Sequence, residues 1–145
     1  MFQDFLELLQ CLNDSKVKYL IIGGYAVIKY AEPRYTKDLD IWVEASTLNA
    51  KKLLQALTKF GAPTENLSVP ELSKPGLIFV FGIPPLRVDI LNKAKGATFK
   101  TAWKNKNKFD LGGVKVNFIS KSDLIKLKRA SARQQDKADL EKLTK

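Results

Sequence analysis

The chain has 145 residues, a formal net charge of +10, one cysteine and no histidine. A chain of this length forms one domain, here residues 1–145, and buries about 70% of its unfolded surface. The lack of histidine excludes Ser–His and Cys–His nucleophilic catalysis and imidazole zinc sites. Chemistry must therefore use carboxylates, lysines, arginines and hard metal ions, for which Mg²⁺ or Mn²⁺ is expected.

Three features predict a soluble, cytoplasmic protein. Cys11 is the single cysteine, so an internal disulfide is excluded. No run of eighteen apolar residues is present, and the first residues do not resemble a signal peptide.

Residues 1–92 contain ten basic and ten acidic residues, whereas residues 93–145 contain fifteen and five, so the last third carries the whole excess charge. Such an imbalance indicates either a polyanionic partner or a solvated surface.

The N-terminal part of the chain predicts a helix, a strand and a glycine turn. Apolar residues recur at helical spacing over residues 2–13, and Tyr19–Ile22 is an apolar strand. Gly23 and Gly24 then turn the chain into a helix over about 25–31. The free N–H groups at the start of this helix would form a phosphate site. Taken alone, the glycine pair is more simply a tight turn.

The next strand, residues 38–43, carries acids at alternate positions. Asp38 and Asp40 share one face, with α-carbons roughly 6.6 Å apart, while Leu39 and its apolar neighbours face the core. Two unpaired carboxylates at that spacing repel by roughly 3 kcal/mol at an effective dielectric near 20. A fold retains such repulsion more readily where the carboxylates bind a metal ion than where they have no function. Before the strand, Arg34 and Thr36 are candidates to contact phosphate or to brace Asp38. The alternatives are a surface arginine and a turn threonine.

The middle of the chain predicts scaffold and a third acid. A helix is expected over about 47–60, an irregular crossing over 61–76, and strands at 77–81 and 86–91. Asp89 interrupts one face of the last strand. It is interpreted as a third metal ligand, with an ion pair to Arg87, two residues away on the same face, as the alternative.

The basic C-terminal third predicts a helix over 97–104, a hairpin over 109–119 and a helical region that begins at Ser120. Trp103 is either a base-stacking residue or core. Four basic residues recur at steps of three, four and four and would form one stripe, interpreted either as a nucleic-acid surface or as a solvated face: Lys126, Arg129, Arg133 and Lys137.

Together, the apolar Gly-Gly turn, the Asp-x-Asp strand and the later apolar-Asp strand resemble the DNA polymerase beta-type nucleotidyltransferase superfamily. The segment Glu32–Asp40 is most similar to its small stand-alone bacterial members, the minimal nucleotidyltransferases and the abortive-infection toxin group. The resemblance implies catalytic, metal-binding roles for Asp38, Asp40 and Asp89. It also implies nucleotide-binding roles for Gly23, Gly24, Tyr25, Arg34, Thr36 and Lys128.

Two details of the resemblance concern single residues. Tyr25 stands where many relatives carry a hydroxyl-bearing turn residue. Residues 127–140 resemble the family's last helices, which implies that Lys128 contacts the triphosphate and that Arg133 and Asp136 fasten the two helices together.

The expected fold class is α/β (α+β): a small mixed twisted sheet of about four or five strands, helices on one face and a helical C-terminus over about 120–145. The expected function is metal-dependent transfer of a nucleoside monophosphate from an NTP to an acceptor hydroxyl or phosphate. An RNA (tRNA) end, as in toxin-like members, suits the basic C-terminal third, and a cognate antitoxin would be a further partner. The alternatives are a small-molecule (antibiotic) nucleotidyltransferase and a non-catalytic nucleic-acid-binding or toxin–antitoxin module.

Overall fold

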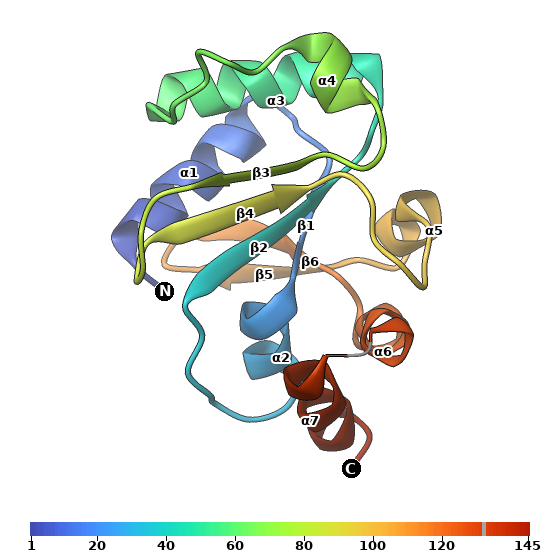
Figure 1. Cartoon of the computed structure of the whole chain (residues 1–145). Helices are drawn as coiled ribbons and strands as arrows, with labels where there is room; N and C mark the ends of the chain where they lie inside the picture. The colour runs from blue at the N-terminus through green and yellow to red at the C-terminus, as the bar shows by residue number, and fades with distance from the viewer. Residues whose placement is uncertain (132) are drawn as a thin grey trace.

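The structure is a computed structural model that describes residues 1–131 and 133–145. Its single sheet is mixed and has six strands in the order β3-β4-β2-β1-β6-β5 (Figure 1). The strands are β1 (Tyr19–Ile22), β2 (Asp38–Val43), β3 (Ile78–Phe81), β4 (Arg87–Leu91), β5 (Asn107–Leu111) and β6 (Val114–Phe118). The helices are α1 (Gln3–Asp14), α2 (Gly23–Tyr30), α3 (Thr47–Phe60), α4 (Val69–Ser73), α5 (Phe99–Lys104), α6 (Lys121–Ala130) and α7 (Gln134–Leu143).

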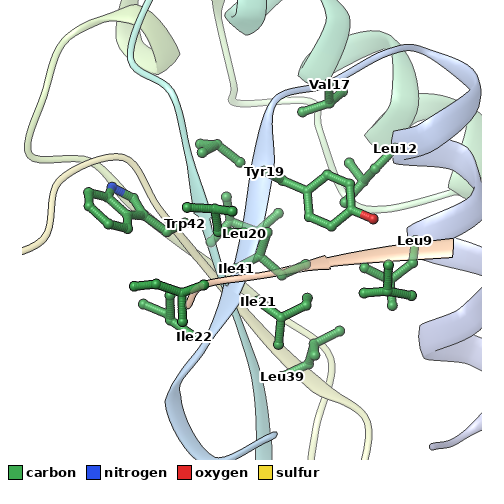
Figure 2. Close-up of a cluster of buried hydrophobic side chains, with 14 of the residues drawn as sticks. Leu9, Leu12, Val17, Tyr19, Leu20, Ile21, Ile22, Leu39, Ile41 and Trp42 are labelled. Atoms are coloured by element: carbon green, nitrogen blue, oxygen red, sulfur yellow. The ribbon is translucent and has the colours of Figure 1, made fainter. Parts of the chain in front are cut away.

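Strand β1 lies at the centre of the core, and all four of its residues are buried. It pairs antiparallel with β2 and parallel with β6, and β2 pairs parallel with β4. Figure 2 shows Tyr19 pointing toward Leu9 and Leu12 of α1, while Trp42 lies on the other side of the strands. On that side the Trp42 ring packs edge-on against Phe99 of α5, with centroids 5.3 Å apart. The core strands are therefore covered on both faces.

The fold class is confirmed, with four local differences. Helices cover both faces of the core strands rather than one, because α1 and α5 lie on opposite sides. The sheet has six strands rather than four or five, because the β5–β6 hairpin joins it through the parallel pairing of β1 with β6. The segment predicted to be an irregular crossing contains α4, whose N-cap Ser68 accepts a hydrogen bond from the Glu71 N–H. The predicted basic stripe is divided, because α6 ends at Ala130 and α7 begins at Gln134.

The helices also bear on the prediction that the protein does not enter a membrane. In the described part of the chain, no helix combines the length and the apolar character that a membrane crossing requires.

Candidate active site

Three carboxylates meet on one face of the sheet, where β2 and β4 lie side by side. The parallel register places Asp40 directly beside Asp89, and Asp38 lies two residues earlier on β2. One oxygen from each of the three side chains lies within 4.8 Å of the other two. The cluster predicted from the sequence is therefore formed by the backbone register, and it needs no rearrangement of the strands.

The glycine turn brings the start of α2 against these acids. The helix begins at Gly23, whose φ of +68° lies in the left-handed region. A Cβ at Gly23 would collide with the Asp40 carboxylate, and one at Gly24 would collide with the Thr36 side chain. Only glycine allows this close approach. The free N–H groups of the first turn therefore lie beside the carboxylate cluster, as an anion-binding helix start requires.

The surroundings of Asp40 disfavour the charged form of its carboxyl group. Burial, and then the neighbouring Asp89 and Asp38 carboxylates, raise the pKa of Asp40 to about 7, although Lys128 and Arg133 act in the opposite direction. A carboxylate held this unfavourably in its charged form is a hallmark of a binding or catalytic site rather than of scaffold. A cation placed among the three acids would relieve that cost.

Arg87 partly neutralises the cluster from the solvent side. Its Nε lies 2.9 Å from Asp89 Oδ1 and 3.8 Å from Asp38 Oδ1, and its Nη2 donates to Asp89 Oδ2 at 3.3 Å. The Arg87 side chain is 40% exposed. The ion pair with Arg87, which was the alternative for Asp89, is therefore present, and Asp89 also lies within the acidic cluster.

A buried ion-pair network fastens α6 and α7 behind the site. Lys128 Nζ lies 2.6 Å from Asp136 Oδ1 and 3.2 Å from Asp139 Oδ2. Arg133 Nε donates to Asp136 at 2.7 Å, and Arg34 Nε lies 3.0 Å from Asp139. Burial alone would raise the pKa of Asp136, but hydrogen bonds from Arg133, Lys128 and Ser131 hold it well below its usual range. These acids are neutralised, in contrast to Asp40.

The cleft has two lobes that share residues of both clusters. The smaller lobe, about 310 Å³, is lined on the side of the glycine turn by Gly24, Arg34, Thr36 and Lys37. The larger lobe, about 500 Å³, extends past Asp89 and is lined by apolar side chains and by Lys93 and Lys95. The two lobes meet at Gly23, Asp40, Lys128, Arg133 and Asp136.

The structure places the other predicted residues as follows. The Thr36 hydroxyl donates to the Asp38 carbonyl at 3.3 Å, so it braces the acidic strand. Arg34 braces Asp139 rather than Asp38. The Tyr25 ring packs edge-on against Phe5, with centroids 5.8 Å apart. Tyr25 therefore contributes its backbone, rather than its ring, to the glycine turn. Lys128 is buried within its ion pairs, whereas Arg133 is 77% exposed.

Three of the predicted basic residues are divided between two helices, with Lys126 and Arg129 on α6 and Lys137 on α7. Sequence reasoning missed Lys37, Lys93 and Lys95 as lining residues. Lys37 directly precedes Asp38, and the other two follow the strand of Asp89. Their position next to the strands that carry the acids was the available signal.

The side chains present fit a divalent cation. Hard carboxylate oxygens are the ligands that Mg²⁺ and Mn²⁺ prefer. Asp38, Asp40 and Asp89 supply them from two adjacent strands, and the raised pKa of Asp40 shows a carboxylate that lacks sufficient positive charge. Asp38, Asp40 and Asp89 are therefore the residues that would hold such an ion.

Solved structures with this architecture include two antibiotic-modifying enzymes. The chain matches the lincosamide antibiotic adenylyltransferase LnuA, solved with lincomycin bound, at a TM-score of 0.57 and 19% identity, over 99% of this chain and 96% of that one. It matches ANT(2″)-Ia, solved in complex with adenylyl-2″-tobramycin, at a TM-score of 0.58 and 15% identity, over 94% and 83%. At these identities the likeness shows the fold.

No curated protein matches the chain in sequence. A family model does match, and it covers all of residues 1–145 under the description "nucleotidyl transferase of unknown function". The chain therefore belongs to this family of nucleotidyl transferases (DUF2204) and is an enzyme of the nucleotidyltransferase type.

Proposed function

We propose that the protein transfers a nucleoside monophosphate from an NTP to a hydroxyl at the end of an RNA such as a tRNA, in the manner of nucleotidyltransferase toxins. The observation that carries the reaction type is the cluster of Asp38, Asp40 and Asp89 beside the Gly23–Gly24 turn. The observation that favours RNA is the +10 charge of the chain.

The smaller lobe suits the triphosphate. The N–H groups at the start of α2 point to its phosphates, and Arg34, Lys37 and Arg133 supply positive charge around it. Lys128 adds a buried positive charge where the two lobes meet. Positioning and charge neutralisation of this kind carry most of the catalysis in phosphoryl transfer.

The larger lobe suits the acceptor. The attacking and leaving oxygens lie roughly in line in such reactions. An acceptor therefore enters on the side of the acids away from the pyrophosphate, which is the Asp89 side. Its hydroxyl oxygen forms a bond to the α-phosphorus while the bond to the bridging oxygen breaks, and pyrophosphate leaves. Asp89 accepts the hydroxyl proton, a role open to a carboxylate in a chain without histidine.

A divalent cation, Mg²⁺ or Mn²⁺, would supply neutralisation of the phosphate charge and a lowered pKa of the attacking hydroxyl. Asp38 and Asp40 would hold it from β2, and Asp89 from β4. Thr36 and Gly24 support this arrangement, because the Thr36 hydroxyl donates to the Asp38 carbonyl and Gly24 leaves room for the Thr36 side chain.

A small-molecule acceptor is the second candidate, because both structural neighbours are antibiotic-modifying enzymes. The two acceptors make different demands on the cleft. A cationic drug would be repelled by Lys93 and Lys95 in the larger lobe, whereas an RNA phosphate would be attracted by them.

The test is incubation of the protein with each radiolabelled NTP, Mg²⁺ and total RNA, with Asp40→Asn in parallel and lincomycin and tobramycin as separate acceptors. We expect label in RNA for the wild type and a loss of at least about a thousandfold in Asp40→Asn. Label in an antibiotic alone would favour the second candidate. Label transfer that persists in Asp40→Asn would refute this site. If RNA is the acceptor, a cognate antitoxin that blocks labelling is also predicted.

A further inference from the structure

A second basic cavity lies away from the active site. It has a volume of about 410 Å³ and lies between the α1–β1 turn, α5 and the β5–β6 hairpin. The side chains that line it include four exposed lysines, Lys16, Lys18, Lys108 and Lys115. Lys106 adjoins them, with its Nζ 4.0 Å from the centre of the Trp103 ring. We call these five lysines the lysine pocket.

The charge of the lysine pocket is poorly compensated. Within the described residues, Lys18 lies 3.7 Å from Glu44, and no carboxylate lies within 4 Å of the other four ammonium groups. Asp110 is across the ladder from Lys115, but its carboxylate accepts the Gly113 N–H in the hairpin turn. Burial, followed by the Lys108 and Lys18 charges, lowers the pKa of Lys106. The cluster therefore has a deficit of negative charge.

The floor of the lysine pocket is rigid. Asn13 of α1 donates to the Lys115 carbonyl at 2.7 Å and accepts from the Tyr19 hydroxyl at 2.8 Å. The Tyr19 hydroxyl also accepts from the Asn117 N–H at 3.4 Å. These bonds connect α1, β1 and β6, so the backbone that carries Lys16, Lys18 and Lys115 is held in a fixed arrangement, as a binding site requires.

The chemistry of the lysine pocket suits phosphates rather than bases. The Trp103 ring is stacked with Phe99 at 5.9 Å between centroids, and Lys106 lies over it. Trp103 thus contacts Phe99 and Lys106, which favours the core role considered for it from the sequence over base stacking. Lysine ammonium groups read charge but not sequence, which is the behaviour of contacts to a nucleic-acid backbone.

The lysine pocket and the active site lie at opposite ends of β1. Lys18 precedes the strand, whereas Gly23 follows it, so the two sites are separated by at least the length of a four-residue strand, about 13 Å. In Figure 1 the chain enters β1 from α1 and leaves it into α2. A polymer of nucleotides is long enough to reach both sites at once.

We propose that the lysine pocket is a docking site for the phosphodiester backbone of the acceptor RNA, which holds the body of the RNA while its end enters the larger lobe of the cleft. This inference rests on the proposed function, because it takes the acceptor to be RNA. It adds a second point of contact that determines the class of substrate but takes no part in the chemistry.

The experiment compares two pairs of lysine substitutions in the full-length protein. Lys108→Ala/Lys115→Ala removes two charges from the lysine pocket, and Lys51→Ala/Lys59→Ala removes two exposed charges from α3. The probe is a fluorescein-labelled tRNA transcript, whose binding is followed by fluorescence polarisation from 50 to 300 mM NaCl. Lys108→Arg/Lys115→Arg, which keeps the charges, is the rescue variant.

We expect the lysine-pocket variant to lose on the order of tenfold in affinity at 50 mM salt. The slope of log affinity against log salt should become shallower by about 1.4 to 1.8, which corresponds to two phosphate contacts. The arginine variant should bind like the wild type. The α3 variant should show less than half of the loss.

Three results would overturn the proposal. They are equal losses in the two alanine variants, unchanged binding in the lysine-pocket variant, and no binding of tRNA by the wild type at 50 mM salt. The melting temperature with Mg²⁺ and ATP is measured in parallel. If the wild type fails to bind tRNA but still shows a shift in melting temperature with Mg²⁺ and ATP, the docking site is refuted and the nucleotidyltransferase site stands.

Discussion

Two groups of buried or half-buried carboxylates lie at one cleft, and the charges of the side chains around them differ: one group is surrounded by cations, the other by further acids. Asp136 and Asp139 are almost fully buried and are enclosed by Lys128, Arg133 and Arg34. Asp40 lies beside two further acids, and its pKa is raised to about 7, whereas that of Asp136 is held well below its usual range. The first group has its counter-charges built into the chain, whereas the second is only partly compensated, chiefly by Arg87. The difference separates scaffold from a site that requires a ligand.

The largest effect should come from breaking the neutralised group. Lys128→Met would leave Asp136 and Asp139 with fewer counter-charges inside the protein, and removal of one partner of a buried ion pair costs about 3–5 kcal/mol. Urea unfolding measures the loss. Lys121→Met, at an exposed position of the same helix, is the control and should change stability by less than about 0.5 kcal/mol. Similar values for the two variants would show that the network is not a structural clamp.

A substitution in the acidic cluster should raise the stability of the protein rather than lower it. Asp40→Asn should stabilise the protein in chelator at pH 8, by about 2 kcal/mol, since it removes a buried charge that nothing sufficiently compensates. Because the folded pKa of about 7 exceeds the ordinary 3.8, the wild type loses stability as the pH rises from about 4 to 7. The advantage of the variant should therefore grow over that window and remain constant above it.

Thermal melts of both proteins at pH 4, 6 and 8 with EDTA provide the measurement. Glu65→Gln, at an exposed position, serves as the control and should show no comparable advantage. A variant that is less stable than the wild type at pH 8 would contradict the account of Asp40.

A smaller effect is expected from Arg87, the cation that partly compensates the cluster. Its guanidinium group contacts Asp89 and lies 3.8 Å from Asp38, so it competes with a metal ion for the same oxygens. Arg87→Ala should tighten Mn²⁺ binding by up to about tenfold, measured by calorimetry without nucleotide. Arg87→Lys, which keeps the charge, should remain near the wild type. Weaker Mn²⁺ binding in Arg87→Ala would mean that Arg87 positions the acids for the metal instead.

The acidic cluster could be predicted from the sequence because alternation along a strand joins two of its acids and the family resemblance supplies the third. Alternation along a strand places Asp38 and Asp40 on one face, and the pairing of β2 with β4 brings Asp89 beside Asp40. The helix α4 could also have been predicted, because Ser68 and Glu71 have the sequence spacing of a capping box, and the Glu71 N–H donates to the Ser68 hydroxyl. Its proline, Pro70, and its length of five residues concealed it.

The neutralised group could not be predicted in the same way. Arg34 and Asp139 are 105 residues apart, and no local pattern couples them. The break between α6 and α7 was implied by the resemblance alone, since the spacing of the basic residues is compatible with one long helix. The lysine pocket, likewise, is assembled from the α1–β1 turn, α5 and the hairpin, which only the sheet order brings together.

The central claim, that Asp38, Asp40 and Asp89 hold divalent cations against a triphosphate, is tested most directly by ligand-induced stabilisation. The melting temperatures of the wild type and Asp40→Asn are compared in EDTA, in Mg²⁺, and in Mg²⁺ with a non-hydrolysable ATP analogue. We predict that the wild type gains stability in Mg²⁺ and gains more with the analogue, while Asp40→Asn begins higher and gains little from either. Equal gains in the two proteins would contradict the claim.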